Sequence, residues 1–284
     1  MQPLSIVGTN AAQLAERVAA RLGGRVAIVT RAGSDADDSP RTAGATDGGT
    51  ARAEATDGST SVDTELTLTA DGEWSGSGAV NGFDEVLDKL APDHEYLVAV
   101  GAPRLRVPTV LLGADTDPEA VPGTVLASAE SPDAVDLGAL ETALESADPW
   151  ITRETLVGRV TESADADRAG AIATFTGRVR TRDSPDDEPT THLAFEAYEG
   201  VAESRMATIR DELCERTGVF DVRMHHRTGV IEAGEDIVFV VVLAGHRREA
   251  FRTVEDGIDR LKDEVPIFKK EVTDAEEFWV HHRD

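Results

Sequence analysis

"DIVFVVVLAGHRREAF", residues 236–251, is the stretch from which the fold of the C-terminal half can be worked out. Its first nine residues form an apolar run with the length and composition of a strand. Gly245 and His246 interrupt the run. Beyond them a helix is predicted at about 248–264, because apolar residues recur at helical spacing, namely Phe251, Val254, Ile258, Leu261 and Val265. The stretch therefore predicts a strand that leads directly into a helix, which Pro266 ends.

Further elements surround this stretch. Strands are predicted at 170–180, 192–199 and 220–227, and the last of these is joined to the apolar run through "EAGED". A helix is predicted within 201–218, where apolar residues are three or four apart, and one or two short strands follow the last helix. This order of elements predicts an α+β domain with an antiparallel sheet.

The first half of the chain has a different order of predicted elements, in which strands and helices alternate. The predicted strands are 4–8, 25–30, 96–101 and 107–113, and the predicted helices are 11–22, 82–91 and 134–147. Such alternation predicts an α/β domain with a mainly parallel sheet. Residues at about 34–62 hold few large apolar side chains and contain "ATDG" twice, so we expect a disordered insertion there. We expect two domains, at 1–148 and 149–284.

The acidic net charge of the chain argues against one class of partner, nucleic acid. Acidic residues outnumber basic ones by 54 to 28. The excess runs through both halves, with 25 against 9 in residues 1–150 and 29 against 19 in the rest. Such a chain repels polyanions, so nucleic acid is not an expected partner. Arginine supplies 24 of the 28 basic residues, and an acidic, arginine-rich composition is typical of halophilic adaptation to a salty cytoplasm, where self-repulsion is screened.

Cysteine and histidine usage adds further expectations. The single cysteine, Cys214, excludes an intrachain disulfide and fits a reducing compartment. No apolar run approaches the roughly 18 residues of a membrane span, so we expect a cytoplasmic protein that does not enter a membrane. Cys214 is expected to be a packing residue. The pairs at 225–226 and 281–282 lack metal-site spacing, so we expect structural or surface histidines, no metal and no bound cofactor.

Lysine is rare but clustered. Lys262, Lys269 and Lys270 are three of the four lysines in the chain. Unlike a guanidinium, an ammonium group loses its proton when it is desolvated or crowded by cations, and the amine then acts as a base or nucleophile. Lys262 is predicted at the margin of the helix stripe near Ile258, and Lys269 shares a strand face with Glu271. The cluster therefore predicts a reactive amine; the alternative is solvated lysines that escaped replacement.

A second group of cations is predicted to bind an anion. His246 and Arg247 stand where a strand ends and a helix begins, so the free backbone amides of the helix add to their charge. "GRVRTR" adds Arg178, Arg180 and Arg182. Together these residues predict a phosphate pocket in an otherwise acidic protein.

Five ordered motifs carry a resemblance to a known family: "GAIATFTGRVR", "FEAYEGVAE", "HHRTGVIEAGEDIVFVVVLAGHRREAF", "LKDEVPIFKKE" and "WVHHR". From about residue 150 to the end, the chain resembles the large, catalytic subunit of molybdopterin synthase. The resemblance implies an α+β fold and a homodimer within a heterotetramer. It also implies a partner, a small ubiquitin-like sulfur carrier whose C-terminal Gly-Gly is a thiocarboxylate. In this family two sulfurs pass to cyclic pyranopterin monophosphate, which forms the dithiolene of molybdopterin.

The same resemblance assigns roles by motif. It implies that Lys262 and Lys269 are essential for catalysis and that Arg283 reaches into the site of the partner protomer. The implied substrate pocket consists of Phe175, Arg180, His246, Arg247 and Glu271.

The first half resembles, more weakly, the adaptor protein of molybdopterin-guanine dinucleotide biosynthesis, through "YLVAVGAPRLRVPTVLLG". The loop after its first strand, "GTNAAQ", holds one glycine, no lysine and no following Ser or Thr, so it lacks the parts of a phosphate-binding loop. We therefore expect a degenerate P-loop-like domain that has lost GTP binding.

Three alternative functions are compatible with these sequence features. The leading one is an enzyme, a sulfurtransferase. The second is a module that docks the tails of ubiquitin-like carriers, or a scaffold for cofactor assembly, without catalysis. The lysine cluster favours the enzyme, because arginine would serve equally well for docking a carboxylate. The third, a GTP-dependent insertion factor, is disfavoured by the missing loop lysine.

Overall fold

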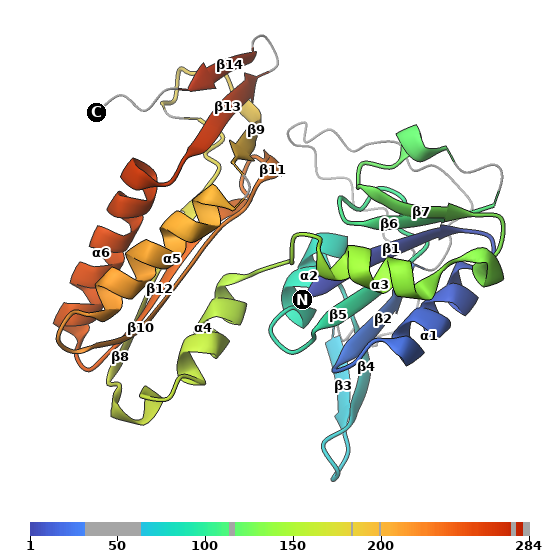
Figure 1. Ribbon diagram of the computed structural model, residues 1–284, viewed down its shortest axis with the longest axis horizontal. Coiled ribbons are helices and arrows are strands. Elements are labelled where there is room, and N and C mark those ends of the chain that lie inside the picture. Colours follow the sequence, from blue (N-terminus) through green and yellow to red (C-terminus); the bar gives the residue numbers. More distant parts are fainter. Residues whose placement is uncertain (32–63, 114–116, 183, 199, 274–276, 281–284) are drawn as a thin grey trace, which may run out of the picture. The chain divides into compact units, whose positions relative to one another are not determined.

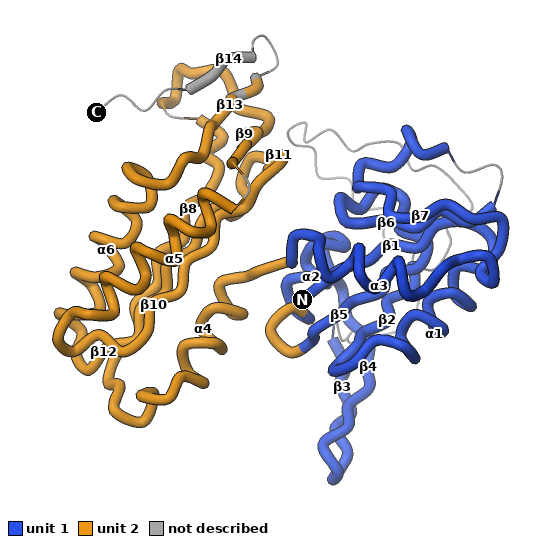
Figure 2. The backbone as a smooth tube through the Cα atoms, in the orientation of Figure 1, with its two compact units in different colours: residues 1–90, 94–149 blue, residues 91–93, 150–284 orange. Residues whose placement is uncertain are grey.

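The computed structural model describes residues 1–31, 64–113, 117–182, 184–198, 200–273 and 277–280. Figure 2 shows its two compact units. The N-terminal unit consists of residues 1–90 and 94–149, and the C-terminal unit of 91–93 and 150–284. The predicted insertion at about 34–62 lies outside the described residues. Among the described helices, none is both long and apolar enough to span a membrane.

The N-terminal unit is built on a parallel sheet, as predicted. Its five strands lie in the order β2-β5-β1-β6-β7, and every neighbouring pair is parallel. Side chains of α1 and α3 pack in one core with the sheet. The strands are β1 (Gln2–Gly8), β2 (Val26–Thr30), β5 (Tyr96–Val100), β6 (Thr109–Leu112) and β7 (Val125–Ala129). The α-helices are α1 (Ala11–Arg21), α2 (Phe83–Leu90) and α3 (Leu137–Glu145), with 3-10 turns at Pro118–Ala120 and Pro132–Ala134. A separate hairpin pairs β3 (Thr64–Leu68) with β4 (Trp74–Gly78).

The loop after β1 is tightly packed against the sheet. Gly8 has φ 112°, and a Cβ built there would lie 1.8 Å from the carbonyl oxygen of Leu112 in β6. Asn10 then takes a left-handed conformation (φ 64°) before α1 begins. The glycine is therefore required by the close approach of two strands.

The C-terminal unit contains two antiparallel sheets, which confirms the predicted sheet type. The three-stranded sheet has the order β10-β12-β8, and the four-stranded sheet has the order β11-β9-β13-β14. The strands are β8 (Ala171–Arg178), β9 (Thr190–Ala197), β10 (Val219–His226), β11 (Gly229–Glu232), β12 (Asp236–Ala244), β13 (Ile267–Thr273) and β14 (Glu277–Val280). The helices are α4 (Arg153–Thr161), α5 (Val201–Cys214) and α6 (Arg247–Glu264), with a 3-10 turn at Ala166–Arg168.

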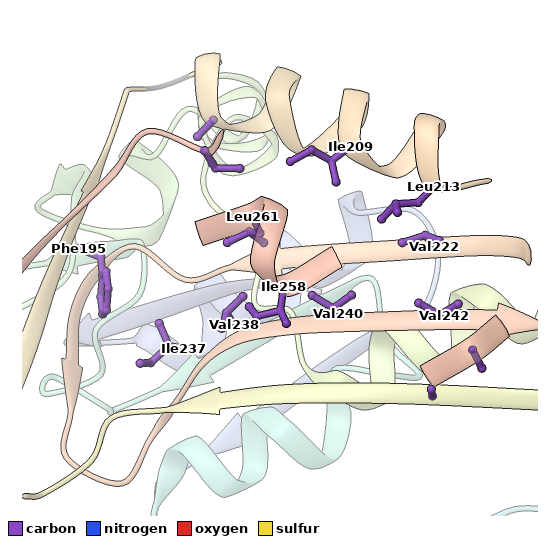
Figure 3. Close-up of a cluster of buried hydrophobic side chains, with 14 of the residues drawn as sticks. Phe195, Ile209, Leu213, Val222, Ile237, Val238, Val240, Val242, Ile258 and Leu261 are labelled. Atoms are coloured by element: carbon purple, nitrogen blue, oxygen red, sulfur yellow. The ribbon is translucent and has the colours of Figure 1, made fainter. Parts of the chain in front are cut away.

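Strand β12 is buried on both faces, which explains its unbroken apolar sequence. Helices α5 and α6 cover one face of the three-stranded sheet and α4 covers the other (Figure 1). Figure 3 shows Val238, Val240 and Val242 of β12 packed with Ile258 and Leu261 of α6. The alternate residues of β12 join a second core with α4; they are Phe239, Val241 and Leu243.

Five strands and helices were not predicted, namely the two strands of the β3–β4 hairpin, β7, α4 and β11. Strand β7 has the small side chains of "VLASA", and α4, "RETLVGRVT", has a weak apolar pattern. A capping box between Thr152 and Thr155 begins α4. Strand β11 interrupts the connection that was predicted to join 220–227 directly to 236–244, and it belongs to the other sheet. The predicted connection through "EAGED" therefore did not include β11, although β10 and β12 do pair.

Candidate functional site

Lys262 lies beside an aromatic ring that was also predicted for the site. It is exposed in the last turn of α6, and its Nζ lies 6.0 Å from the centroid of the Phe175 ring on β8. An ammonium over a ring face at an exposed site gains roughly 0.5–1 kcal/mol. The Phe175 ring itself packs against the core, so it provides a fixed wall for the lysine head.

Lys269 approaches the same core from the four-stranded sheet. It is half-buried on β13 and lies opposite Phe195 of β9. Directly opposed residues share a sheet face, so the stem of Lys269 lies beside the buried Phe195 ring. Leu261, next to Lys262 in the chain, belongs to the same core cluster as Phe195. Both lysines therefore stand at the margin of one core.

Lys270 and Glu271 follow Lys269 on β13. Lys270 lies opposite Ala194, and its side chain points to the other face of the sheet from Lys269. Glu271 pairs with Leu193 in the ladder, and its side chain lies outside the described part of the structure. Arg283 also lies outside the described residues.

The arginines after β8 have separate surroundings. Arg178 forms an ion pair with Asp236 (3.1 Å) and donates a hydrogen bond to the carbonyl oxygen of Gly234. Arg182 donates to the carbonyl oxygen of Pro185 within its own loop (3.3 Å). Arg180 is exposed just beyond the strand. Of the three arginines predicted to bind phosphate, Arg178 contacts the turn before β12 and Arg182 contacts its own loop, while the phosphate-binding role of Arg180 stays a prediction.

His246 and Arg247 lie at the beginning of α6. His246 has an extended backbone (φ −140°, ψ 159°) as the N-cap residue, and its side chain makes no capping hydrogen bond. Arg247 is the first helical residue, and both side chains are exposed. The unpaired amides of the first turn and the helix dipole add positive potential at this position. The helix start and the two exposed side chains are compatible with an anion site, and the binding of a phosphate there stays a prediction.

The predicted residues nevertheless fall into two separate groups. Arg247 begins α6 and Lys262 comes fifteen residues later, so the helix rise of 1.5 Å per residue places their backbones about 22 Å apart. Strand β8 likewise separates Arg180 from His246 within one chain. Ala171 pairs with Ala244 near His246, and Arg180 lies nine residues beyond Ala171, roughly 30 Å at the rise of a strand. Within one chain the phosphate group and the lysine group are not in contact.

Phe251 corrects one detail of the predicted helix. It was placed in the apolar stripe with Val254 and Ile258, yet its side chain is 64% exposed. The buried side chains of α6 include Ala250, Ile258 and Leu261, whereas Phe251 is exposed in the first turns of the helix.

The histidine pair on β10 lies inside the unit. Burial, and then the nearby charge of Arg227, lowers the pKa of His225 to about 3. Burial lowers the pKa of His226 to about 4, although its Nδ1 lies 2.7 Å from the carbonyl oxygen of Arg227. The His226 ring meets Phe195 edge to face at 4.9 Å. Both rings therefore have packing roles, in line with the structural role predicted for them.

Cys214 also packs against the core, at the end of α5. Desolvation raises the pKa of its thiol, which disfavours the thiolate that a sulfur-carrying nucleophile needs. Among the residues that the structure describes, no group of three or more His, Cys, Asp or Glu side chains could hold a metal ion.

Comparisons with known proteins agree with the motifs of the C-terminal unit. Residues 151–264 match the family model described as MoaE protein. The chain is 52% identical over 284 residues to "Probable molybdopterin synthase" of Haloferax volcanii, with 100% of both chains covered. It is 41% identical over 111 residues to "Molybdopterin synthase catalytic subunit" of Pyrococcus abyssi, which covers 39% of this chain and 74% of that one.

A solved structure of molybdopterin-guanine biosynthesis protein B is 18% identical, covers 50% of this chain and 95% of that chain, and has a TM-score of 0.29. A likeness of this size carries no argument, so the resemblance of the first half to an adaptor protein stays a prediction. The match to the Haloferax volcanii protein, by contrast, extends over both units. The chain belongs to the molybdopterin synthase family, and residues 151–264 are its MoaE protein region.

Proposed function

We propose that this protein is the catalytic subunit of a molybdopterin synthase, with its site in the C-terminal unit. It transfers sulfur from a thiocarboxylated ubiquitin-like carrier to cyclic pyranopterin monophosphate during molybdenum cofactor biosynthesis in the cytoplasm. The observation that carries the proposal is the convergence of Lys262, with its head over Phe175, and Lys269, beside Phe195, on the margin of one core. In a chain with four lysines, two at such a position point to a need for amines.

The two groups of residues have different chemical tasks. The lysines act on the end of the carrier tail, where a neutral amine serves as a base and a charged one holds the carboxyl end. Arg180, His246 and Arg247 bind the substrate phosphate, for which charged donors and helix amides are suited. Glu271 and Arg283 are assigned to the pocket by the resemblance alone.

The separation of these groups supports a dimer as the working unit. One pterin monophosphate is roughly 10 Å long, about eight bonds, and does not span 22 Å. A homodimer within a heterotetramer, with one small carrier on each protomer, allows the phosphate group of one protomer to serve the lysines of the other.

The N-terminal unit is proposed to be a degenerate relative of the adaptor protein. Its parallel sheet supports this assignment, and the tight packing of Gly8 against Leu112 leaves the loop after β1 with a structural task. We propose that this unit has lost GTP binding and assists cofactor assembly as a scaffold.

Reconstitution tests the enzymatic proposal. The purified protein is mixed at high salt with a thiocarboxylated Gly-Gly carrier and the cyclic pterin, and molybdopterin is measured as its fluorescent oxidised derivative. The variants are Lys262→Arg and Lys269→Arg. Lys89→Arg is a matched control, because Lys89 is exposed on α2, where it forms an ion pair with Glu85 (2.7 Å). We expect product from the wild type and the control, and near-total loss in both test variants.

Two other outcomes separate the alternatives. Full activity in both arginine variants refutes the need for an amine and leaves the enzyme assignment standing. No product from the wild type, while the carrier still binds, refutes sulfur transfer and favours a docking module.

A further inference from the structure

Four charged side chains form a network between two helices, the α5–α6 network: Arg205 and Glu212 on α5, and Arg260 and Glu264 on α6. The carboxylate of Glu264 accepts hydrogen bonds from the Nε of Arg260 (2.6 Å) and from Arg205. Arg260 in turn donates to Glu212. The network therefore crosses twice between helices that lie side by side (Figure 1).

The charge of Glu264 depends on its two arginines. Glu264 is the last residue of α6, where a carboxylate faces the negative end of the helix dipole and is unfavourable by itself. Both nitrogens of the Arg260 fork donate to it, at 2.6 and 3.2 Å, and these bonds, followed by that of Arg205, lower the pKa of Glu264. The side chains of Glu264 and Arg260 are only 26% and 24% exposed. A two-pronged, partly shielded network of this kind is the exception to the weakness of surface ion pairs.

Lys262 lies in the same turn as Glu264 but points away from the network. Arg260 and Glu264 are each two residues from Lys262, which at about 100° per residue places them about 160° from it around the helix axis. The Lys262 amine lies 6.0 Å from the centroid of the Phe175 ring, and it forms no hydrogen bond or ion pair with the other described residues. Its position is therefore set by the backbone of the last turn.

The end of α6 has few other restraints. Val265 leaves the helix with an extended backbone (φ −90°, ψ 123°), and its N–H donates to the carbonyl oxygen of Leu261 (3.1 Å). The carbonyls of a final turn lack helical partners, so helix ends open more readily than helix interiors. Leu261 is buried between the two flanks of the turn, with Lys262 on one flank and Glu264 on the other. Leu261 anchors the turn in the core, and the network restrains its rotation about the helix axis.

We propose that Glu264 is a positioning residue: with Arg205 and Arg260 it fixes the last turn of α6 and so holds the Lys262 amine over Phe175. Glu264 acts through the backbone, without touching the lysine. The inference rests on the proposed function for the task of Lys262, but the position of the amine can be measured without it. Reactions at a positioned group are sensitive to displacement, and about 1 Å can cost roughly a hundredfold in rate.

The scarcity of lysine makes the position of Lys262 measurable by NMR. Reductive methylation with ¹³C-formaldehyde labels the four lysines, and Lys→Arg variants assign their signals. The ring of Phe175 displaces the methyl signals of Lys262, and Phe175→Leu calibrates this displacement by removing it. We expect Glu264→Gln to move the Lys262 signals toward their position in Phe175→Leu and to leave those of the other three lysines unchanged.

Asp256→Asn is the matched control. Asp256 pairs with Arg216, just beyond α5, so the change also replaces an acid by its amide in an ion pair between the same two segments. Asp256 is six residues before Lys262, about 9 Å along the helix. We expect wild-type NMR signals and wild-type kcat in this control. In Glu264→Gln we expect kcat to fall roughly tenfold. Its KM for the pterin should be unchanged, because the phosphate is bound at the other end of the helix.

Arg205→Met separates position from charge and guards against misfolding of the first variant. It breaks the network as Glu264→Gln does, but it changes the electrostatic potential at Lys262 in the opposite direction. We therefore expect both variants to displace the Lys262 signals and lower kcat, with the midpoint of the pH profile of kcat unchanged.

Four results overturn the proposal. They are Lys262 signals that stay in place in both variants, an equal displacement in Asp256→Asn, a displaced signal with wild-type kcat, and pH midpoints that move in opposite directions in the two variants. If the signals move as expected but the wild-type protein makes no molybdopterin, the proposed function is refuted and the positioning of Lys262 by Glu264 stands.

Discussion

Complementation between two inactive variants would show how the site is divided. Lys262→Ala removes the amine over Phe175, and Arg247→Ala removes the phosphate-binding guanidinium at the beginning of α6. Both side chains are exposed, so neither change is expected to affect the fold. The 22 Å between the two positions on α6 exceeds the length of the substrate, so we expect each variant alone to be inactive and the pair to complement.

The expected magnitude follows from counting sites. In a heterodimer of the two variants, one site combines Lys262 of one chain with Arg247 of the other, and both residues are intact. The second site lacks both residues. The purified heterodimer should therefore show about half of the wild-type activity per dimer, and a random mixture, in which half of the dimers are heterodimers, about a quarter.

The assay uses co-expression of the two variants with different affinity tags and tandem purification, followed by the molybdopterin fluorescence measurement. Each homodimeric variant is the control and should give only background. If each site lay within one protomer, both sites of the heterodimer would lack one residue, and the heterodimer would be as inactive as its parents. That result would refute the divided site.

Two predictions concern stability. Burial holds His225 and His226 neutral with pKa values of about 3 and 4, below the unfolded value of 6.5, so protons bind preferentially to the unfolded chain as the pH falls. The free energy of unfolding should be at its full value above pH 6.5 and decrease between about pH 6.5 and 3. Denaturant titrations should show a decrease of about 2 kcal/mol over this range, a value discounted because both rings are partly exposed. A variant without both histidines should show only the background trend. Gly8→Ala should destabilise the N-terminal unit by about 3 kcal/mol or more, because its Cβ would meet the carbonyl of Leu112 at a left-handed φ. Gly23→Ala, where nothing lies within 4 Å, should leave the melting temperature nearly unchanged.

The sequence predicted the elements that carry strong periodicity. The run at 236–244 became β12, and the helical spacing that begins after His246 became α6 within one residue of the predicted start. These elements are buried along a whole face, so their pattern is long and consistent. Strand β7 was missed because it is short and half-buried, and β11 because three of its four residues are exposed; a period of two cannot be read from such segments.

The candidate site was predicted as a set of residues but not as an arrangement. Lys262 and Phe175 come together because α6 crosses β8, which no spacing in the sequence indicates. The separation of Arg247 from Lys262 follows from the sequence, because the length of the predicted helix alone places them about 22 Å apart. The exposure of Phe251 could not, since it depends on how far the sheet extends beneath α6.

The order of strands along the chain has a consequence for biosynthesis. From β8 to β13 successive strands alternate between the two sheets, so β13 and β14 are the one described pair in this unit whose strands are consecutive in the chain. The three-stranded sheet lacks its centre until β12 has been made, and the four-stranded sheet waits for β13. Non-local pairing of this kind slows folding, because loops must close before contacts form. A ribosome must therefore deliver nearly the whole chain before this unit can fold, and a transcript truncated before Lys269 would yield an unfolded fragment rather than a folded but inactive protein.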